Sequence, residues 1–250
     1  MVQIKNSEQL ACMRKAGRIT GEAILVAREH IKEGVSTKLL DTLIRNYIEK
    51  CGAKPSFLGY GGFPGSACIS INNEVIHGIP SAKRFLKEGD IVKIDVGAYI
   101  GGFHGDSANT FGVGKISEEA EKLIAVTRES FFRGVKMAAR GKRVGDIGSE
   151  ICGYAEGLGY GVVRKFVGHG VGHELHEDPE IPNFGTAGRG ARLYPGMTIA
   201  IEPMINAGTR DVKVLEDGWT VITADGSLSA HYEHTVAITD GEPILLTYVE

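Results

Sequence analysis

Apolar residues recur every three or four positions in four stretches of the chain, which is the spacing of one face of an α-helix. The first stretch follows Ser7, a candidate N-cap, and Gly34 lies beyond its end. Gly52 follows the second stretch, and Ser117 with three glutamates opens the third. The pattern predicts helices over about residues 10–31, 36–51, 117–139 and 144–158.

Short apolar runs bounded by glycines lie between and after these helices, and such runs are typical of strands. They predict strands at about 67–71, 91–99, 103–113, 161–167, 197–202 and 231–239. The fold class that follows is α+β, with an antiparallel sheet backed by helices.

The order of two helices followed by several strands occurs twice, which indicates an internal duplication with halves at about 7–113 and 117–240. A local echo supports it, because the run 104–106 (His-Gly-Asp) precedes Thr110 as the run 231–233 (His-Tyr-Glu) precedes Thr235. The alternative is chance, since this order of elements is common and a three-residue echo carries little information.

Length and charge narrow the class of protein. The 250 residues suffice for one large domain, and no run rich in Pro, Ser or charge marks a linker, so we expect a single domain over 1–250. A net charge of −3 argues against nucleic acid or an acidic membrane as the main partner. Four scattered cysteines, no apolar run of membrane-spanning length and no signal-peptide core predict a reduced, cytoplasmic protein.

Two aspartates occupy unusual places between Ile91 and Val113. Asp95 interrupts an apolar run, although Asp is depleted in strands. A hairpin turn centred between residues 100 and 101 would place Asp95 opposite Asp106, where like charges repel unless they share a proton or a cation. The alternative is a different register in which one of the two acids caps a turn.

Two glutamates also lie in apolar strands, where acidic residues are unusual. Glu202 is the last residue of one predicted strand, and Glu233 lies within another. His169 follows a further apolar strand and is flanked by glycines. The nearby run 173–176 (His-Glu-Leu-His) lacks the i, i+4 histidine pair of a zincin helix, so we reject that interpretation. Four carboxylates and one imidazole suit two divalent ions of Mn, Fe(II), Co or Zn, which commonly activate water for hydrolysis.

The set Asp95, Asp106, His169, Glu202 and Glu233, with its neighbours, resembles the metal ligands of the pita-bread metallopeptidases. Three runs extend the resemblance to the type I methionyl aminopeptidases: 73–80 (NEVIHGIP), 168–172 (GHGVG) and 202–203 (Glu-Pro). The similarity covers nearly the whole chain, from about residue 7 to 244, and implies the pita-bread fold with its pseudo-two-fold sheet.

Segment lengths separate this chain from its relatives. Prolidases and aminopeptidase P carry an additional N-terminal domain, for which too few residues precede Asp95. Type II methionyl aminopeptidases have a long insertion between the last two acidic ligands, whereas the interval between Glu202 and Glu233 is short. The zinc-binding extension of eukaryotic cytosolic enzymes is also absent. The chain therefore resembles the short, bacterial-type form.

The resemblance implies a role for each residue of the set. Asp95 would bind one metal ion, and His169 and Glu202 the other, while Asp106 and Glu233 would bridge the two ions. Glu202 would also act as general base toward the attacking water.

Two further histidines receive roles from the same resemblance. His176 would polarise the scissile carbonyl and stabilise the oxyanion. His77 would position the substrate backbone beside the leaving amine.

The resemblance further implies a methionine pocket, in which Tyr60, Cys68 and Trp219 match the family. Other members have different apolar or aromatic residues at three more pocket positions: Phe57, Phe63 and Leu175. The Cys68 side chain would line the pocket and would not act as a nucleophile, because no base is evidently paired with it. Asn72 and Ser229 resemble the positions of a structural monovalent-cation site.

The function implied is removal of the initiator methionine from nascent chains with a small second residue, by a monomeric enzyme that works at the ribosome. Two alternatives remain open: another pita-bread peptidase, such as an X-Pro type, and a pita-bread binding protein that has lost catalysis. The five intact ligand positions argue against the second, because such proteins typically lose ligands.

Overall fold

A computed structural model describes residues 2–249 of the chain. Four α-helices lie in this part of the chain, and all four match helices predicted from the apolar spacing. The helices are α1 (Ser7–Arg28), α2 (Thr37–Lys50), α3 (Glu118–Lys136) and α4 (Val144–Gly157). A 3₁₀ turn, η1 (Tyr60–Gly62), lies between α2 and the first long strands.

The strands form one large antiparallel sheet and two small sheets. Their bounds are β1 (Lys54–Pro55), β2 (Ala67–Ile71), β3 (Glu74–Ile76), β4 (Ile91–Ile100), β5 (Phe103–Gly112), β6 (Gly161–Val162), β7 (Gly168–Gly170), β8 (Glu177–Ile181), β9 (Thr198–Ile201), β10 (Met204–Asn206), β11 (Val212–Val214), β12 (Val221–Thr223), β13 (Ser229–His231), β14 (Glu233–Ala237) and β15 (Ile244–Leu245).

The helix ends follow local hydrogen-bonding signals, some of which differ from the predicted ones. The N-cap of α1 is Asn6 and not Ser7, because the Asn6 side chain accepts from the backbone of Gln9 and the Gln9 side chain accepts from the backbone of Asn6. The helix ends at Arg28, earlier than its apolar spacing suggests. Helix α2 begins after Ser36, whose hydroxyl caps the amide of Leu39.

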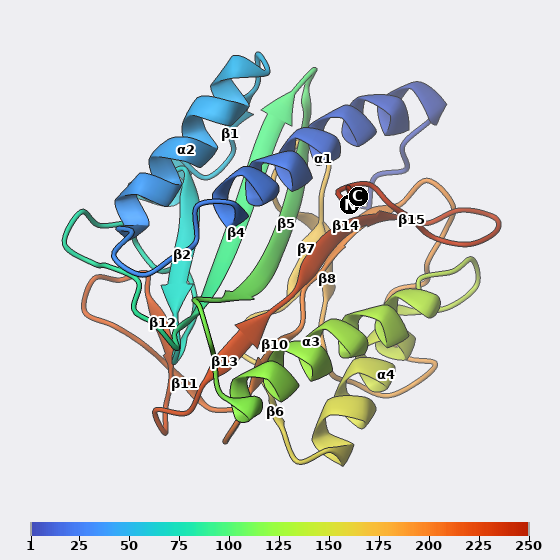
Figure 1. The fold of residues 1–250 in the computed structure, drawn as a ribbon. Coiled ribbons are helices and arrows are strands. Elements are labelled where there is room, and N and C mark those ends of the chain that lie inside the picture. Colours follow the sequence, from blue (N-terminus) through green and yellow to red (C-terminus); the bar gives the residue numbers. More distant parts are fainter. Residues whose placement is uncertain (1, 250) are drawn as a thin grey trace.

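The central sheet has the order β1-β4-β5-β14-β9-β7-β8, with β2 also paired to β4 and β15 to β14. Helix α1 packs on β4 and β5, and α2 packs against α1 and beside β1 and β2, while α3 and α4 lie over the part built from the later strands (Figure 1). The late strand β14 therefore lies in the middle of the sheet, between strands from the two parts of the chain.

Alternation along β4 decides which face of the sheet carries the chemistry. Val92, Ile94 and Val96 are fully buried in the core shared with α1 and α2. Because successive strand residues point to opposite faces, Lys93 and Asp95 point away from these helices. The polar site is consequently built on the face of the sheet that α1 and α2 do not cover.

The β4–β5 hairpin has a different register from the predicted one. Gly101 and Gly102 form its two-residue turn with φ of 62° and 86°, a conformation that favours glycine. The turn centre is thereby displaced, so Asp95 pairs with Ala108 and Asp106 pairs with Gly97. The prediction that the two aspartates are directly opposed is wrong, but the shift of two residues leaves both on one face.

Two predicted strands are shorter or divided. The run 161–167 contributes only β6, and 231–239 separates at Tyr232 into β13 and β14, which belong to different sheets. Among residues 2–249 no helix has the length and apolar character needed to span a membrane.

Candidate active site

Five neighbouring strands each deliver one of the predicted metal ligands to the same face of the central sheet. In the spatial order β4, β5, β14, β9 and β7 these ligands are Asp95, Asp106, Glu233, Glu202 (directly after its strand) and His169. Residues far apart in the sequence thus converge because the strands that carry them are hydrogen-bonded side by side. All five line one cavity of about 250 Å³.

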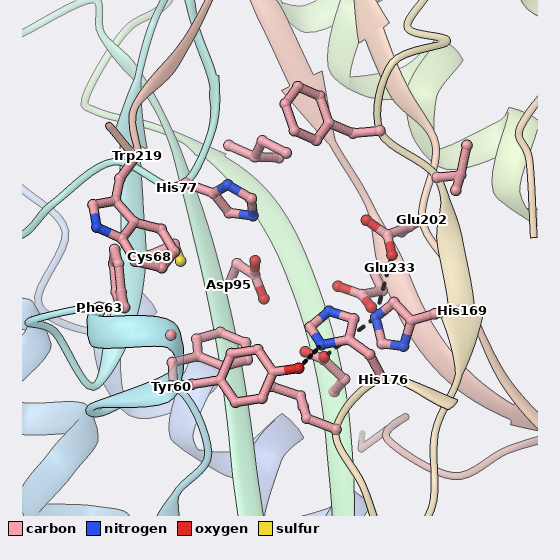
Figure 2. Close-up of a pocket in the computed structure, with 17 residues that line it drawn as sticks. Tyr60, Phe63, Cys68, His77, Asp95, His169, His176, Glu202, Trp219 and Glu233 are labelled. Atoms are coloured by element: carbon pink, nitrogen blue, oxygen red, sulfur yellow. Dashed lines mark hydrogen bonds and ion pairs between the residues drawn. The ribbon is translucent and has the colours of Figure 1, made fainter. Parts of the chain in front are cut away.

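The centre of the set is compact and buried. Single ligand atoms of Asp106, His169 and Glu233 all lie within 4.8 Å of one another. The Nε2 atom of His169 is 3.5 Å from Glu202 Oε1, on the side that Figure 2 shows. It is also 3.8 Å from Asp106 Oδ2. These separations leave room for an ion between the donor atoms.

Burial makes the charged forms of these carboxylates unfavourable. It raises the pKa of Asp106 to about 7, and it raises the pKa values of Asp95, Glu202 and Glu233 well above their usual range, with the charge of Asp106 as the next cause for all three. Within the described residues, Asp95 Oδ1 and Asp106 Oδ1 are buried without a hydrogen-bond partner. Several buried carboxylates that lie close together, with oxygens that lack hydrogen-bond partners, fit a site for divalent cations.

The ring of His169 is oriented for ligation by its own strand. Its Nδ1–H donates to the Gly170 carbonyl at 2.9 Å, which leaves the lone pair of Nε2 directed at the carboxylates. Burial, with a smaller effect of His176, lowers the pKa of His169 to about 3, so the ring is neutral at pH 7. A neutral imidazole is the form that binds a metal ion.

His176 lies at the mouth of the cavity. Its ring centroid is 4.1 Å from that of His169, and its Nδ1 forms a 2.7 Å hydrogen bond with the Tyr60 hydroxyl (Figure 2). Burial of its ring atoms lowers the pKa of His176. The hydrogen bond to Tyr60 fixes the ring so that the remaining nitrogen is available to a bound molecule.

His77 lies across the cavity from His176, next to Trp219 (Figure 2). Its backbone φ of 59° is unusual for a residue with a side chain, and the ring packs edge-on against Phe166 and Trp219. Burial is the main cause that lowers the pKa of His77 to about 4. The ring is therefore a neutral hydrogen-bonding group at pH 7.

The apolar end of the cavity contains all six predicted pocket residues. Four of them form one buried cluster, against which Trp219 packs: Phe57, Phe63, Cys68 and Leu175. Tyr60 lies at the rim toward His176. Burial raises the pKa of Cys68 well above its usual range, which opposes a role as nucleophile.

The sequence analysis predicts neither the apolar lining residues Ile76, Phe166 and Val167 nor one buried histidine beside the glutamates, His231. His231 is 1% exposed, and neither ring nitrogen has a hydrogen-bond partner among the described residues. Its Nε2 lies 3.8 Å from Glu202 Oε2 and 4.0 Å from Glu233 Oε2. The signal in the sequence was its position two residues before Glu233, on the same apolar run.

The region predicted for a monovalent cation is also assembled, but it contains a lysine. Lys93 Nζ donates to the carbonyl oxygens of Asn72 and Ser229, at 2.7 and 3.0 Å. Burial lowers the pKa of Lys93 to about 7, while the charges of Glu74 and Asp90 act in the opposite direction.

Comparisons with known proteins agree with this geometry. The sequence profile of Metallopeptidase family M24 matches residues 11–240. The chain is 56% identical to a methionine aminopeptidase of Clostridium acetobutylicum over 250 residues, with 100% of both chains covered. It is 51% identical to methionine aminopeptidase 1 of Bacillus subtilis over 249 residues, again with 100% of both covered. The crystal structure of a Thermotoga maritima methionine aminopeptidase superimposes with a TM-score of 0.98 at 45% identity, covering 100% of each chain.

Proposed function

The chain belongs to Metallopeptidase family M24, and from this premise we propose that it removes the N-terminal methionine of proteins by hydrolysis at a site for two divalent metal ions. The activity is that of a metal-dependent methionine aminopeptidase, a hydrolase of the pita-bread fold. The observation that carries the proposal is the convergence of five ligands from five adjacent strands on one wall of an apolar cavity.

The donor set supports the metal assignment. Asp95 would hold one ion, His169 and Glu202 the other, and Asp106 with Glu233 would be shared between them. Four carboxylates and one imidazole suit Co, Mn, Fe(II) or Zn. When bound, such ions supply a Lewis acid for the scissile carbonyl and lower the pKa of water.

Glu202 is the residue that we assign to proton transfer. Glu202 directly follows β9, and its carboxylate lines the cavity. Burial raises the pKa of this carboxylate well above the usual range. A carboxylate with a raised pKa accepts a proton from the attacking water more readily and can return it to the departing amine.

The two rim histidines would act on the substrate. His176, held by Tyr60 at 2.7 Å, would donate a hydrogen bond to the oxygen on which negative charge develops. His77, packed against Trp219, would hold the substrate backbone beside the leaving amine. Both rings line the same cavity as the five ligands, which supports these roles.

Specificity would come from the cluster of Phe57, Phe63, Cys68, Leu175 and Trp219. An apolar pocket of this kind favours an unbranched thioether over a charged side chain. It should discriminate only slightly against norleucine, which differs mainly at the sulfur. A small second residue is preferred by analogy with the family.

We propose the following setting for the activity. The substrates are N-termini of nascent chains at the ribosome, and the enzyme acts in the cytoplasm as a monomer without direct contact to nucleic acid or membrane. A net charge of −3 and four unpaired cysteines support this setting. The whole chain is one catalytic domain of two pseudo-repeats, about 7–113 and 117–240.

The decisive experiment is release of the first residue from Met-Gly, Lys-Gly and Ala-Pro peptides by the purified protein, with Mn²⁺ or Co²⁺ and after chelation. We expect metal-dependent release of methionine from Met-Gly and none of lysine. Cleavage of Ala-Pro in preference to Met-Gly would favour an X-Pro peptidase. Absence of any hydrolysis at saturating metal would favour a binding protein.

A further inference from the structure

Lys93 is a fully buried charged residue that the proposed chemistry does not use. It lies within β4, two residues before Asp95, and its side chain is among the largest that the fold buries completely, at 1% exposure. Lysine is almost never buried in this way without partners. Both hydrogen bonds of its Nζ go to backbone carbonyl oxygens, those of Asn72 and Ser229.

The two carbonyls are held in place by contacts that do not involve the lysine. Asn72 has a left-handed φ of 51°, its side-chain amide donates to Asp90 Oδ1 at 2.7 Å, and its side-chain oxygen accepts from Ile91 N at 2.9 Å. The Ser229 amide donates to the Asn72 carbonyl at 3.1 Å. The two oxygens therefore form a preorganised cradle for one positive charge.

Converging backbone carbonyls are the ligands that alkali cations prefer. The resemblance in sequence predicted a separate monovalent cation at these same two residues. That prediction does not fit the structure, because Lys93 Nζ lies 2.7 and 3.0 Å from both oxygens and a second cation there would meet its volume and its charge.

We propose that the Lys93 side chain is the structural cation of this protein, so that neither Na⁺ nor K⁺ is needed at this position. An ammonium group offers three donors and no acceptor, which matches a cradle made only of acceptors. The amino group is covalently attached, so unlike a bound ion it cannot be lost by dilution.

The position of the cradle gives the lysine a mechanical role. Asn72 lies in the turn between β2 and β3, and β3 leads directly into His77. Ser229 begins β13, which runs through Tyr232 into Glu233. Lys93 therefore ties together three segments that carry site residues, without touching the substrate cavity itself. It is a positioning residue and not a catalytic one.

The test is thermal unfolding of the metal-loaded enzyme in choline chloride, NaCl and KCl at equal ionic strength. The wild-type Tm should be the same in all three salts. Lys93→Ala, which vacates the cradle, should have a lower Tm in choline chloride. Saturating Na⁺ or K⁺ should then raise it by roughly 5–10 °C, because an ion that binds only the folded state stabilises by mass action.

Two controls separate a cation effect from a packing effect. Lys93→Met fills the space without charge and should be destabilised in every salt, with no recovery in KCl. Lys213→Ala removes an exposed lysine whose Nζ also faces a carbonyl, that of Ala224 at 3.4 Å, and should behave as wild type. If Lys93→Ala does not fold in choline chloride, its refolding yield in KCl against choline chloride gives the same readout.

Two results would overturn the proposal. One is a saturable rise of the wild-type Tm with Na⁺ or K⁺, which would mean that the protein binds a separate ion. The other is a Lys93→Ala variant that KCl neither stabilises nor helps to refold. Because the readout is stability, these outcomes are independent of whether the assigned peptidase activity is correct.

Discussion

The acidic side chains of the cavity have pKa values set by their position in the sheet. Asp106 is 3% exposed, and burial moves its pKa from an ordinary value of 3.8 to about 7. Glu202 and Glu233 are raised by the same cause. Without a metal ion, the folded protein therefore prefers these carboxyls protonated, whereas the unfolded chain ionises them near pH 4.

A pH dependence follows for the metal-free protein. A raised folded-state pKa of an acid stabilises the fold at low pH, and this stability is lost as the pH rises from about 4 through about 7. The buried histidines contribute an opposite slope, because their lowered pKa values favour the folded state at higher pH. We therefore compare chelated wild type with chelated Asp106→Asn, which share those histidines.

Between about pH 4 and about pH 7, we expect the free energy of unfolding of wild type to fall relative to that of Asp106→Asn, by at most about 1.4 kcal/mol per pH unit. The measurement is the free energy of urea unfolding at several pH values. Parallel curves for the two proteins would mean that Asp106 titrates normally in the fold. Saturating metal should remove the loss, since metal binding requires the ionised form.

The two neighbouring histidines are predicted to differ in what their loss removes. His169→Ala deletes a metal-donating imidazole, so metal content and activity should fall together. His176→Ala removes a hydrogen-bond donor held by Tyr60, so most of the metal should remain while kcat falls on the order of 10²–10³-fold.

The measurement is metal stoichiometry beside steady-state kinetics on a Met-Ala-Ser peptide. Loss of metal in His176→Ala with retention in His169→Ala would reverse the two roles. Full kcat in both variants would place the catalytic site elsewhere.

Individual site residues were predictable where the sequence broke a local rule. Asp95 is predictable because an acid within an apolar strand needs a partner, and the structure places it in the cavity with the other four proposed ligands. His231 was overlooked because a histidine within a strand breaks no such rule. Lys93 was overlooked for a related reason, since a lysine in a strand is ordinarily exposed, and only the three-dimensional packing buries it.

At the scale of elements, the segment before α1 clamps the loop that carries His176. Lys5 Nζ lies 2.5 Å from Glu177 Oε2, with the two side chains 2% and 5% exposed. The Lys5 amide also donates to the Gly196 carbonyl at 2.8 Å. Glu177 directly follows His176, so this buried ion pair joins the start of the chain to the rim of the cavity.

Breaking this pair from one side should be costly. Lys5→Met leaves the Glu177 carboxylate buried without its partner and should lower the free energy of unfolding by about 3–5 kcal/mol. The double variant Lys5→Met, Glu177→Leu should recover much of that loss, because no unpaired charge remains. Urea unfolding of the single and double variants measures both effects.

The exposed pair of Arg45 and Glu49, whose side chains are both 48% exposed, provides the control. Its removal should change stability by less than about 1 kcal/mol. A Lys5→Met variant as stable as this control would show that the ion pair does not clamp the loop.

Elements were predictable in kind, but their pairing was not. Helical spacing identified all four helices, since that signal is local. The predicted register of β4 with β5 was wrong because the register depends on where the turn is centred. The two glycines at 101–102 allow more than one position for that centre. The break at Tyr232 was not predictable either, because the run continues to alternate while the chain passes from one sheet to another.

For the whole molecule, the proposed metal site is the point at which the two parts of the chain meet. Asp95 and Asp106 come from strands that pack against α1, and the other three proposed ligands come from the later part. An ion held by both sets would cross-link the sheet at its centre, where β5 pairs with β14. The order of these strands in space could not be deduced from the sequence, because it rests on long-range pairing.

Removal of the metal should consequently affect both stability and turnover. We expect chelation to abolish peptidase activity and to lower the Tm, and addition of Mn²⁺ or Co²⁺ to restore both. At a free metal concentration of about a hundred times the dissociation constant, the free energy of unfolding should rise by about 2.7 kcal/mol. Differential scanning calorimetry with a parallel activity assay checks the prediction, and activity that survives exhaustive chelation would contradict the two-metal assignment.

The central place of β14 has a consequence for how a new copy of this chain matures. A ribosome delivers residues in sequence order, so Glu233 and the strand that fills the gap between β5 and β9 emerge among the last. Until then β5 and β9 have no common neighbour and the ligand set lacks one member. A copy still under synthesis therefore lacks a complete set of proposed ligands, and we expect it to become active only after its last strands have been added.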